Sequence, residues 1–133
     1  MAVDRCKIIV VEPDVRALKE IEAKLSSVCF VVGIVKPERT LPTVQAERVA
    51  KLIIVSTAKG IDSLGLLDSV RRENPNLLRI LLTGFEDLTQ VVEGLHSGAV
   101  QRVMSKPLQH AELLGLIRST MPSQNAASVT SPL

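Results

Sequence analysis

Five polar residues stand directly after apolar runs, and their side chains are the ones in this sequence that could do chemistry. They are Glu12, Lys36, Ser56, Thr83 and Lys106. In open parallel sheets, functional residues lie at the carboxyl ends of the strands. If each run is such a strand, a carboxylate, two hydroxyls and two ammonium groups could face one crevice. That set of groups does not by itself identify a reaction.

The identity of Ser56 decides which reaction this group of residues could support. It follows the unbroken run Leu52-Ile53-Ile54-Val55, three of whose members are β-branched, as in a strand buried on both faces. A hydroxyl there supports different chemistry from a carboxylate. As a nucleophile, Ser56 would need an adjacent base. We expect His96 and His110 on helices away from the strand ends, where neither could be that base.

The elements that would position these residues follow from the apolar pattern. Strand-type runs alternate with segments that carry apolar residues at helical spacing. Five such units predict an α/β fold, in which a parallel sheet carries helices on both faces. The predicted strands are residues 6–11, 29–35, 52–56, 77–83 and 100–105, and the last of these has the polar interruptions of a sheet edge. The first predicted helix begins after Pro13. The other predicted helices cover 40–49, 63–73, the segment from 86 or 87 to Gly98, and 109–120.

Leu88, Val91, Val92 and Leu95 are predicted to share one face of the fourth helix. The weakest helix prediction is 40–49, because its apolar stripe is thin and contains a proline.

Composition limits the class of protein. The 133 residues fit one domain, and their net charge of +2 gives no electrostatic footprint for nucleic acid. No apolar run approaches the roughly 18 residues of a membrane span, and the first residues lack the apolar core of a secretion signal. Cys6 and Cys29 are too few for a disulfide framework, so we expect reduced, packed thiols near the starts of two strands. A cytoplasmic location fits these features.

The second half of the chain carries a family resemblance. Leu81-Leu82-Thr83-Gly84-Phe85, then Gly98-Ala99-Val100, then Ser105-Lys106-Pro107 occur in the order and spacing of a response-regulator receiver domain. The resemblance covers residues 6 to 121 and includes the acidic residue after the first strand. It implies a flavodoxin-like fold, a doubly wound five-stranded parallel sheet of order 2-1-3-4-5. We therefore expect a receiver-like domain at 1–121. The composition changes after Pro122 to Ser, Gln, Asn, Ala and Thr, which predicts a disordered tail or linker at 122–133 because this segment has little to bury.

The receiver resemblance assigns a role to each strand-end residue. Receivers accept a phosphoryl group on an Asp that ends strand three, and two acidic residues after strand one help that Asp to hold Mg²⁺. Thr83 resembles the switch hydroxyl, and Lys106 the phosphate-contacting lysine. Glu12 corresponds to the first acidic position, Pro13 occupies the second, and Ser56 occupies the phosphoacceptor position.

Three departures from the family pattern indicate a degenerate, or pseudo-, receiver. Ser56 cannot form an acyl phosphate or supply a carboxylate ligand, and Pro13 removes another oxygen ligand. Mg²⁺ needs near-octahedral oxygen coordination, usually anchored by one or two carboxylates plus phosphate, so weak binding or none is predicted. Val103 stands where many receivers carry an aromatic residue that moves on activation.

Two other aspartates are alternative acceptors. Asp62 lies six residues beyond Ser56, where an N-cap role explains it better. Asp14 falls in the first turn of a predicted helix, where the helix dipole stabilises it. A minor alternative is that Asp14 leans toward the crevice and restores one metal ligand.

The resulting hypothesis is a non-enzymatic signalling module that works by protein contact and independently of phosphorylation, within two-component phosphorelay signalling. Its partner would be a histidine kinase or an effector domain, and a homodimer is a further option. The predicted contact face is the fourth helix, fifth strand and fifth helix, with Gln90, Arg102 and Gln109 among its residues. The alternatives are a functioning phosphoacceptor that uses an unconventional residue, and the regulatory domain of a longer effector protein.

Lys106 should also have a partner inside the site. A buried ammonium without a partner is costly. We therefore expect Lys106 to pair with Glu12, directly or through one water, with Ser56 or Thr83 as a hydroxyl neighbour. The competing arrangement sends Lys106 to solvent or to a backbone carbonyl, while Glu12 pairs with Lys36 or Lys59.

Overall fold

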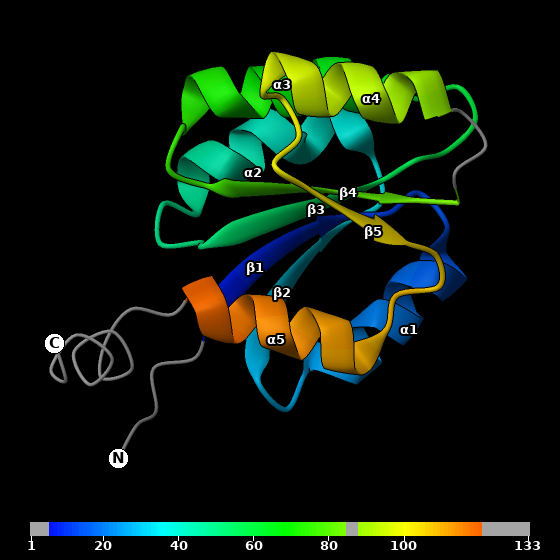
Figure 1. Ribbon diagram of the computed structural model, residues 1–133. Coiled ribbons are helices and arrows are strands. Elements are labelled where there is room, and N and C mark those ends of the chain that lie inside the picture. The colour runs from blue at the N-terminus through cyan, green and yellow to red at the C-terminus, as the bar shows by residue number, and fades with distance from the viewer. Residues whose placement is uncertain (1–5, 85–87, 121–133) are drawn as a thin grey trace, which may run out of the picture.

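The computed structural model of the chain describes residues 6–84 and 88–120. Its five strands form one parallel sheet in the order β2-β1-β3-β4-β5 (Figure 1). The predicted flavodoxin-like α/β fold is therefore confirmed. The strands are β1 (Cys6–Val11), β2 (Cys29–Ile34), β3 (Leu52–Ser56), β4 (Leu78–Thr83) and β5 (Arg102–Ser105). The helices are α1 (Val15–Leu25), the 3₁₀ turn η1 (Pro37–Arg39), α2 (Thr40–Ala46), α3 (Ser63–Glu73), α4 (Leu88–Ser97) and α5 (His110–Thr120).

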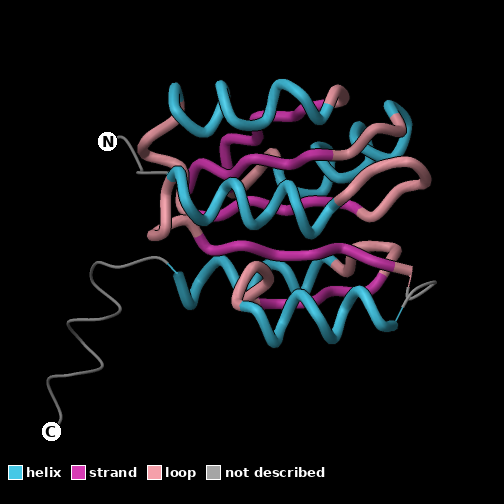
Figure 2. The backbone as a smooth tube through the Cα atoms, turned by 90° about the horizontal axis from the view of Figure 1, so that it is seen from above, coloured by secondary structure: helices cyan, strands magenta, loops and turns pink. Residues whose placement is uncertain are grey.

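The sheet separates two layers of helices. Helices α1 and α5 cover one face, and α2, α3 and α4 cover the other (Figure 1). Seen from above, the strands lie nearly side by side (Figure 2), and each neighbouring pair is parallel. Consecutive strand residues alternate between the two layers, so Ile54 packs on the α1/α5 side and Ile53 on the opposite side. Both faces are thus covered, which explains why β3 is apolar without interruption.

Most elements lie where the local sequence pattern predicts them. The bounds of β1, β3 and α3 are those predicted. The weak segment at 40–49 is a short helix that ends at Ala46, with Pro42 in its first turn. The fifth strand is at the edge of the sheet, as predicted, but it begins at Arg102. The predicted tail, 122–133, and the predicted helix start at Glu86 or Asp87 lie outside the described residues.

The apolar residues predicted to share one face of α4 are mostly exposed, and only Val91 among them is buried. Val91 and Gly94 are the buried residues of this helix, whereas Leu88, Val92 and Leu95 are 61%, 63% and 47% exposed. Gly94 is the reason. A Cβ built there would lie 2.5 Å from Leu64 Cδ2 and 2.7 Å from Val100 Cγ2. Because Gly94 has no side chain, α4 can pack closely against Leu64 and Val100 at that position. The side of the helix that carries Gly94 therefore faces the core, and Leu88 and Leu95 face outward.

Arg79, on β4, braces the amino-terminal end of the sheet. Its guanidinium donates from Nε to the Ala99 carbonyl oxygen at 3.1 Å and from Nη2 to that of Gly98 at 3.0 Å. Nη1 donates to the carbonyl oxygens of Leu77 at 3.2 Å and Pro75 at 3.4 Å. Burial lowers the pKa of Arg79, and the neighbouring Arg71 lowers it further. One cation thus joins β4 to the segment between α4 and β5.

Within residues 6–84 and 88–120, no helix is long and apolar enough to cross a membrane.

Candidate functional site at the carboxyl edge of the sheet

The structure brings the predicted strand-end residues to one edge of the sheet. Val11 of β1 is in register with Val55 of β3, so Glu12 and Ser56 follow neighbouring positions. Ser56 is itself in register with Leu82, and Thr83 is in register with Ser105, which precedes Lys106. Backbone bonds continue this order beyond the strands, because the Lys106 amide donates to the Thr83 carbonyl oxygen at 2.9 Å.

Strand alternation divides these residues between the two faces. Val10, Ile54 and Met104 belong to the core cluster beneath α1 and α5. Glu12, Ser56 and Lys106 each lie two positions further along, so they fall on that same face. Leu81 belongs to the opposite cluster, which assigns Thr83 to the α3/α4 side.

Glu12 is held in place by the turn that starts α1. The residue is only 5% exposed. Its Oε2 accepts a hydrogen bond from the Asp14 amide at 3.0 Å. Asp14 in turn caps α1, because its Oδ1 accepts from the amides of Arg16 at 2.9 Å and Ala17 at 3.3 Å. The carboxylate of Asp14 is therefore committed to the helix start, in the manner of an N-cap.

Lys106 bonds to a backbone carbonyl. Its Nζ donates to the Thr57 carbonyl oxygen at 2.5 Å. No ion pair between Lys106 and Glu12 occurs among the described residues, so the direct pairing expected from the sequence is wrong, and the carbonyl alternative holds. The reason is proximity: the β3–α3 loop brings the Thr57 carbonyl to the ammonium, while the Asp14 amide already engages Glu12. In the same described part of the chain, neither Lys36 nor Lys59 pairs with Glu12.

Two hydroxyls at the end of β3 are buried without a hydrogen-bond partner among the described residues. They are Ser56 Oγ and Thr57 Oγ1. Ser56 is 1% exposed, and its carbonyl oxygen accepts from the Ser63 hydroxyl at 3.5 Å. An unpaired buried hydroxyl costs free energy. The phosphoacceptor position of the receiver resemblance thus holds a small, enclosed side chain with no base bonded to it in the described residues.

The remaining predicted residues take up the following positions. Thr83 is buried, and Val103 is half-buried against the core on the α3/α4 side. Asp62 is the N-cap of α3, since its Oδ1 accepts from the Gly65 amide at 2.9 Å. His96 lies in the last turn of α4 and His110 begins α5, so both are on helices, as predicted.

A cavity of about 310 Å³ opens between α1 and the β5–α5 loop beside this edge. Glu12 and Lys106 both line it, so the two predicted groups share a space although they do not pair directly. Lys24 closes its far side by donating from Nζ to the Leu108 carbonyl oxygen at 2.8 Å. The other lining residues are Ala17, Glu20, Ile21, Leu82, Pro107 and Leu108. The volume is at the lower end of the range for small-molecule sites.

Sequence reasoning missed the α1 wall of this cavity and the role of Thr57. A charged residue such as Lys24 in a helix gives no sequence signal of an inward role, and only its tertiary contact with Leu108 gives it a structural role. Thr57 acts through its backbone carbonyl, which every residue has, so no sequence signal could have found it.

The donor set at this edge is poor for a divalent cation. Glu12 is the only carboxylate among Glu12, Pro13 and Ser56, and one of its oxygens already accepts from a backbone amide. The described residues contain no group of three or more His, Cys, Asp or Glu that could hold a metal ion. Mg²⁺ usually relies on carboxylates together with phosphate oxygens. The residues present therefore do not fit the Mg²⁺ that the receiver resemblance implies.

Several solved structures similar to this one are receiver domains. The signal receiver domain of an HD domain-containing protein from Pseudomonas fluorescens Pf-5 is 27% identical, with a TM-score of 0.76 over 88% of this chain and 94% of that chain. A CheY-like receiver domain protein from Methanospirillum hungatei JF-1 is 20% identical, with a TM-score of 0.77 over 87% and 93%. The fold is that of a receiver domain.

A third similar structure is described as an adenylate cyclase from Rhodopirellula baltica. It is 24% identical, with a TM-score of 0.79 over 87% of each chain. At this identity the likeness concerns the fold alone. No protein-family model and no curated protein sequence matches the chain.

Proposed function

We propose that this chain is a degenerate receiver, a signalling module in two-component signal transduction that works by protein contact and without phosphorylation. The observation that carries the proposal is Ser56, which stands at the carboxyl end of β3 with 1% exposure. A serine there cannot form the acyl phosphate that an aspartate would. Its hydroxyl has no bonded base among the described residues, and a hydroxyl nucleophile needs one.

The engagement of the two candidate substitute acceptors, Asp14 and Asp62, supports the same proposal. The carboxylates of Asp14 and Asp62 each accept a hydrogen bond from a backbone amide at the start of a helix. Phosphorylating either carboxylate would break its cap, which typically contributes about 1 kcal/mol. An unconventional acceptor is therefore the second candidate function, and the regulatory domain of a longer effector is compatible with both. No catalytic role is proposed for the residues at this edge.

The contact surface that we propose is formed by α4, β5 and α5. Figure 1 shows β5 at the edge of the sheet, between α4 on one side and α5 on the other. Leu88, Val92 and Leu95 form an exposed apolar stripe along α4. Arg102 of β5 and Gln109, which precedes α5, are exposed, and Gln90 of α4 is half-buried. Apolar residues with a polar rim are typical of protein interfaces, so a kinase, an effector domain or a second copy of the chain could bind here.

A titration with Mg²⁺ and beryllofluoride, a mimic of the phosphoryl group, tests this function. We expect the amide NMR signals of Glu12 and Ser56 to stay nearly unmoved at millimolar metal, because one carboxylate cannot replace three ligand groups. An ordinary receiver that carries an aspartate at the acceptor position serves as the positive control. Saturable shifts of both signals at low millimolar concentrations would count against the proposal.

A further inference from the structure

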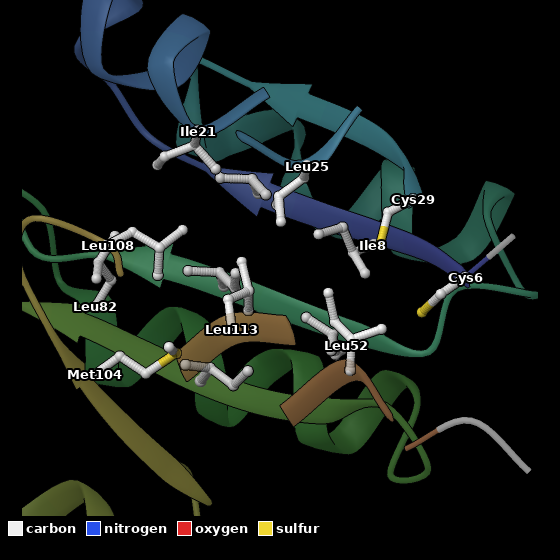
Figure 3. Packing of buried hydrophobic residues seen from close by; sticks show 14 of the residues in the cluster. Cys6, Ile8, Ile21, Leu25, Cys29, Leu52, Leu82, Met104, Leu108 and Leu113 are labelled. Carbon is white, nitrogen blue, oxygen red and sulfur yellow. The ribbon is translucent and has the colours of Figure 1, made fainter. Parts of the chain in front are cut away.

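Cys6 and Cys29 lie directly opposite one another on neighbouring strands. They are Cα partners in the parallel register of β1 and β2, and each is the first residue of its strand. In-register residues of parallel strands point to the same face. Both belong to the core cluster beneath α1 and α5, with exposures of 3% and 2%. Figure 3 shows them at the same end of that cluster.

The two thiols interact with each other. A hydrogen bond from the Cys29 thiol lowers the pKa of Cys6, and the nearby Lys51 ammonium lowers it further against the opposing effect of burial. The same contact and burial raise the pKa of Cys29. The Lys51 ammonium acts on Cys6 and favours its thiolate, which is the reactive form, and Cys29 is the thiol beside it.

The two cysteines alone do not provide the ligands of a metal site. A structural zinc site takes four ligands from Cys, His or acidic residues. In the part of the chain that the structure describes, no group of three or more such residues exists. Two thiols at in-register positions of neighbouring strands have a different reaction open to them, which is oxidation to a disulfide.

We propose that Cys6 and Cys29 are a covalent modification site, where peroxide converts the two thiols to an intramolecular disulfide and a dithiol reductant restores them. The Cys6 thiolate attacks one oxygen of hydrogen peroxide. The O–O bond breaks, Cys6 becomes a sulfenic acid, and the other oxygen leaves as water after taking up a proton. Cys29 Sγ then attacks Cys6 Sγ, the S–O bond breaks, and the second oxygen leaves as water with the Cys29 proton. Two thiols and one peroxide thus give one disulfide and two waters.

The disulfide would tie the edge strand β2 to β1 at their starts. The chain between the two cysteines, residues 7–28, contains α1 and the turn that holds Glu12. Closing this loop restricts the unfolded chain. The oxidised protein should therefore be more stable than the reduced protein, and the cross-link would stiffen the segment that carries the acidic position of the candidate site.

The test uses the full chain, treated with hydrogen peroxide under native conditions and then measured by intact mass and non-reducing peptide mapping. We expect a loss of two hydrogen atoms, a peptide that links Cys6 to Cys29, and reversal by dithiothreitol. The melting temperature should rise by about 5–10 °C on oxidation. Cys6→Ala and Cys29→Ala are matched controls, in which neither the mass loss nor the rise in melting temperature should occur.

The wild-type chain alone can overturn the proposal, whatever the variants do. Thiols that remain titratable after unfolding would show that peroxide does not reach the pair. Added oxygen atoms on one cysteine, or a disulfide between two chains, would show that the two sulfurs do not combine within one molecule. Each of these results contradicts the inference.

Discussion

The double variant Pro13→Asp with Ser56→Asp is expected to bind Mg²⁺ at low millimolar concentrations, with an affinity at least about tenfold above that of the natural chain. The two new carboxylates would stand beside Glu12, at positions that the register of β1 and β3 makes neighbours. Without metal, three crowded and partly buried carboxylates should lower the free energy of unfolding by about 3 kcal/mol. Amide NMR titration and thermal unfolding with and without Mg²⁺ measure both effects.

Stability should return as metal is added, because a ligand that binds only the folded state stabilises it by about 2.7 kcal/mol at a hundred times its dissociation constant. The variant Pro13→Asn with Ser56→Asn is the matched control: it has similar shape without the charges, and we expect it to fold without gaining the metal site. A folded Asp variant that shows no metal-dependent change would mean that Pro13 and Ser56 are not the vacated acidic positions.

Replacing Arg79 with methionine is expected to lower the free energy of unfolding by about 3 kcal/mol. The side chain donates to four carbonyl oxygens around the start of β4 and the loop before β5. Methionine fills part of the space but leaves the buried acceptors unpaired. Urea unfolding followed by circular dichroism measures the change.

Arg72→Met provides the comparison for Arg79. The Arg72 side chain is 72% exposed and pairs only with Asp68 of the same helix among the described residues. Exposed pairs of this kind contribute about 0–1 kcal/mol. If both arginine variants lose the same small amount, the carbonyl contacts of Arg79 do not brace the sheet.

The parts of the fold that could be predicted are those set by local pattern. The apolar runs of β1 and β3 and the apolar spacing of α3 determine their own boundaries. The orientation of α4 could not be predicted from its own residues. Which side of the helix is buried is decided by the close approach of Gly94 to Leu64 of α3, which is distant in sequence, and to Val100, which follows the helix.

For the candidate site, the sequence predicts where the residues lie but not which groups they contact. That Glu12, Ser56, Thr83 and Lys106 end at one edge of the sheet follows from strand ends and parallel order. Which group Lys106 contacts depends on where a loop places a carbonyl oxygen, and Thr57 provides it. The charges of Glu12 and Lys106 suggested an ion pair, but sequence does not reveal the backbone groups that engage both side chains first.

The measurement that tests the central proposal most directly is intact mass spectrometry of the chain after incubation with acetyl phosphate and Mg²⁺. Phosphorylation independence predicts an unchanged mass, while an ordinary receiver treated in parallel gains one phosphoryl group. Peptide mapping of the wild-type chain and of Ser56→Ala locates any group that is added. A phosphoryl group on Ser56, or on Asp14 or Asp62 of the folded protein, would contradict the proposal.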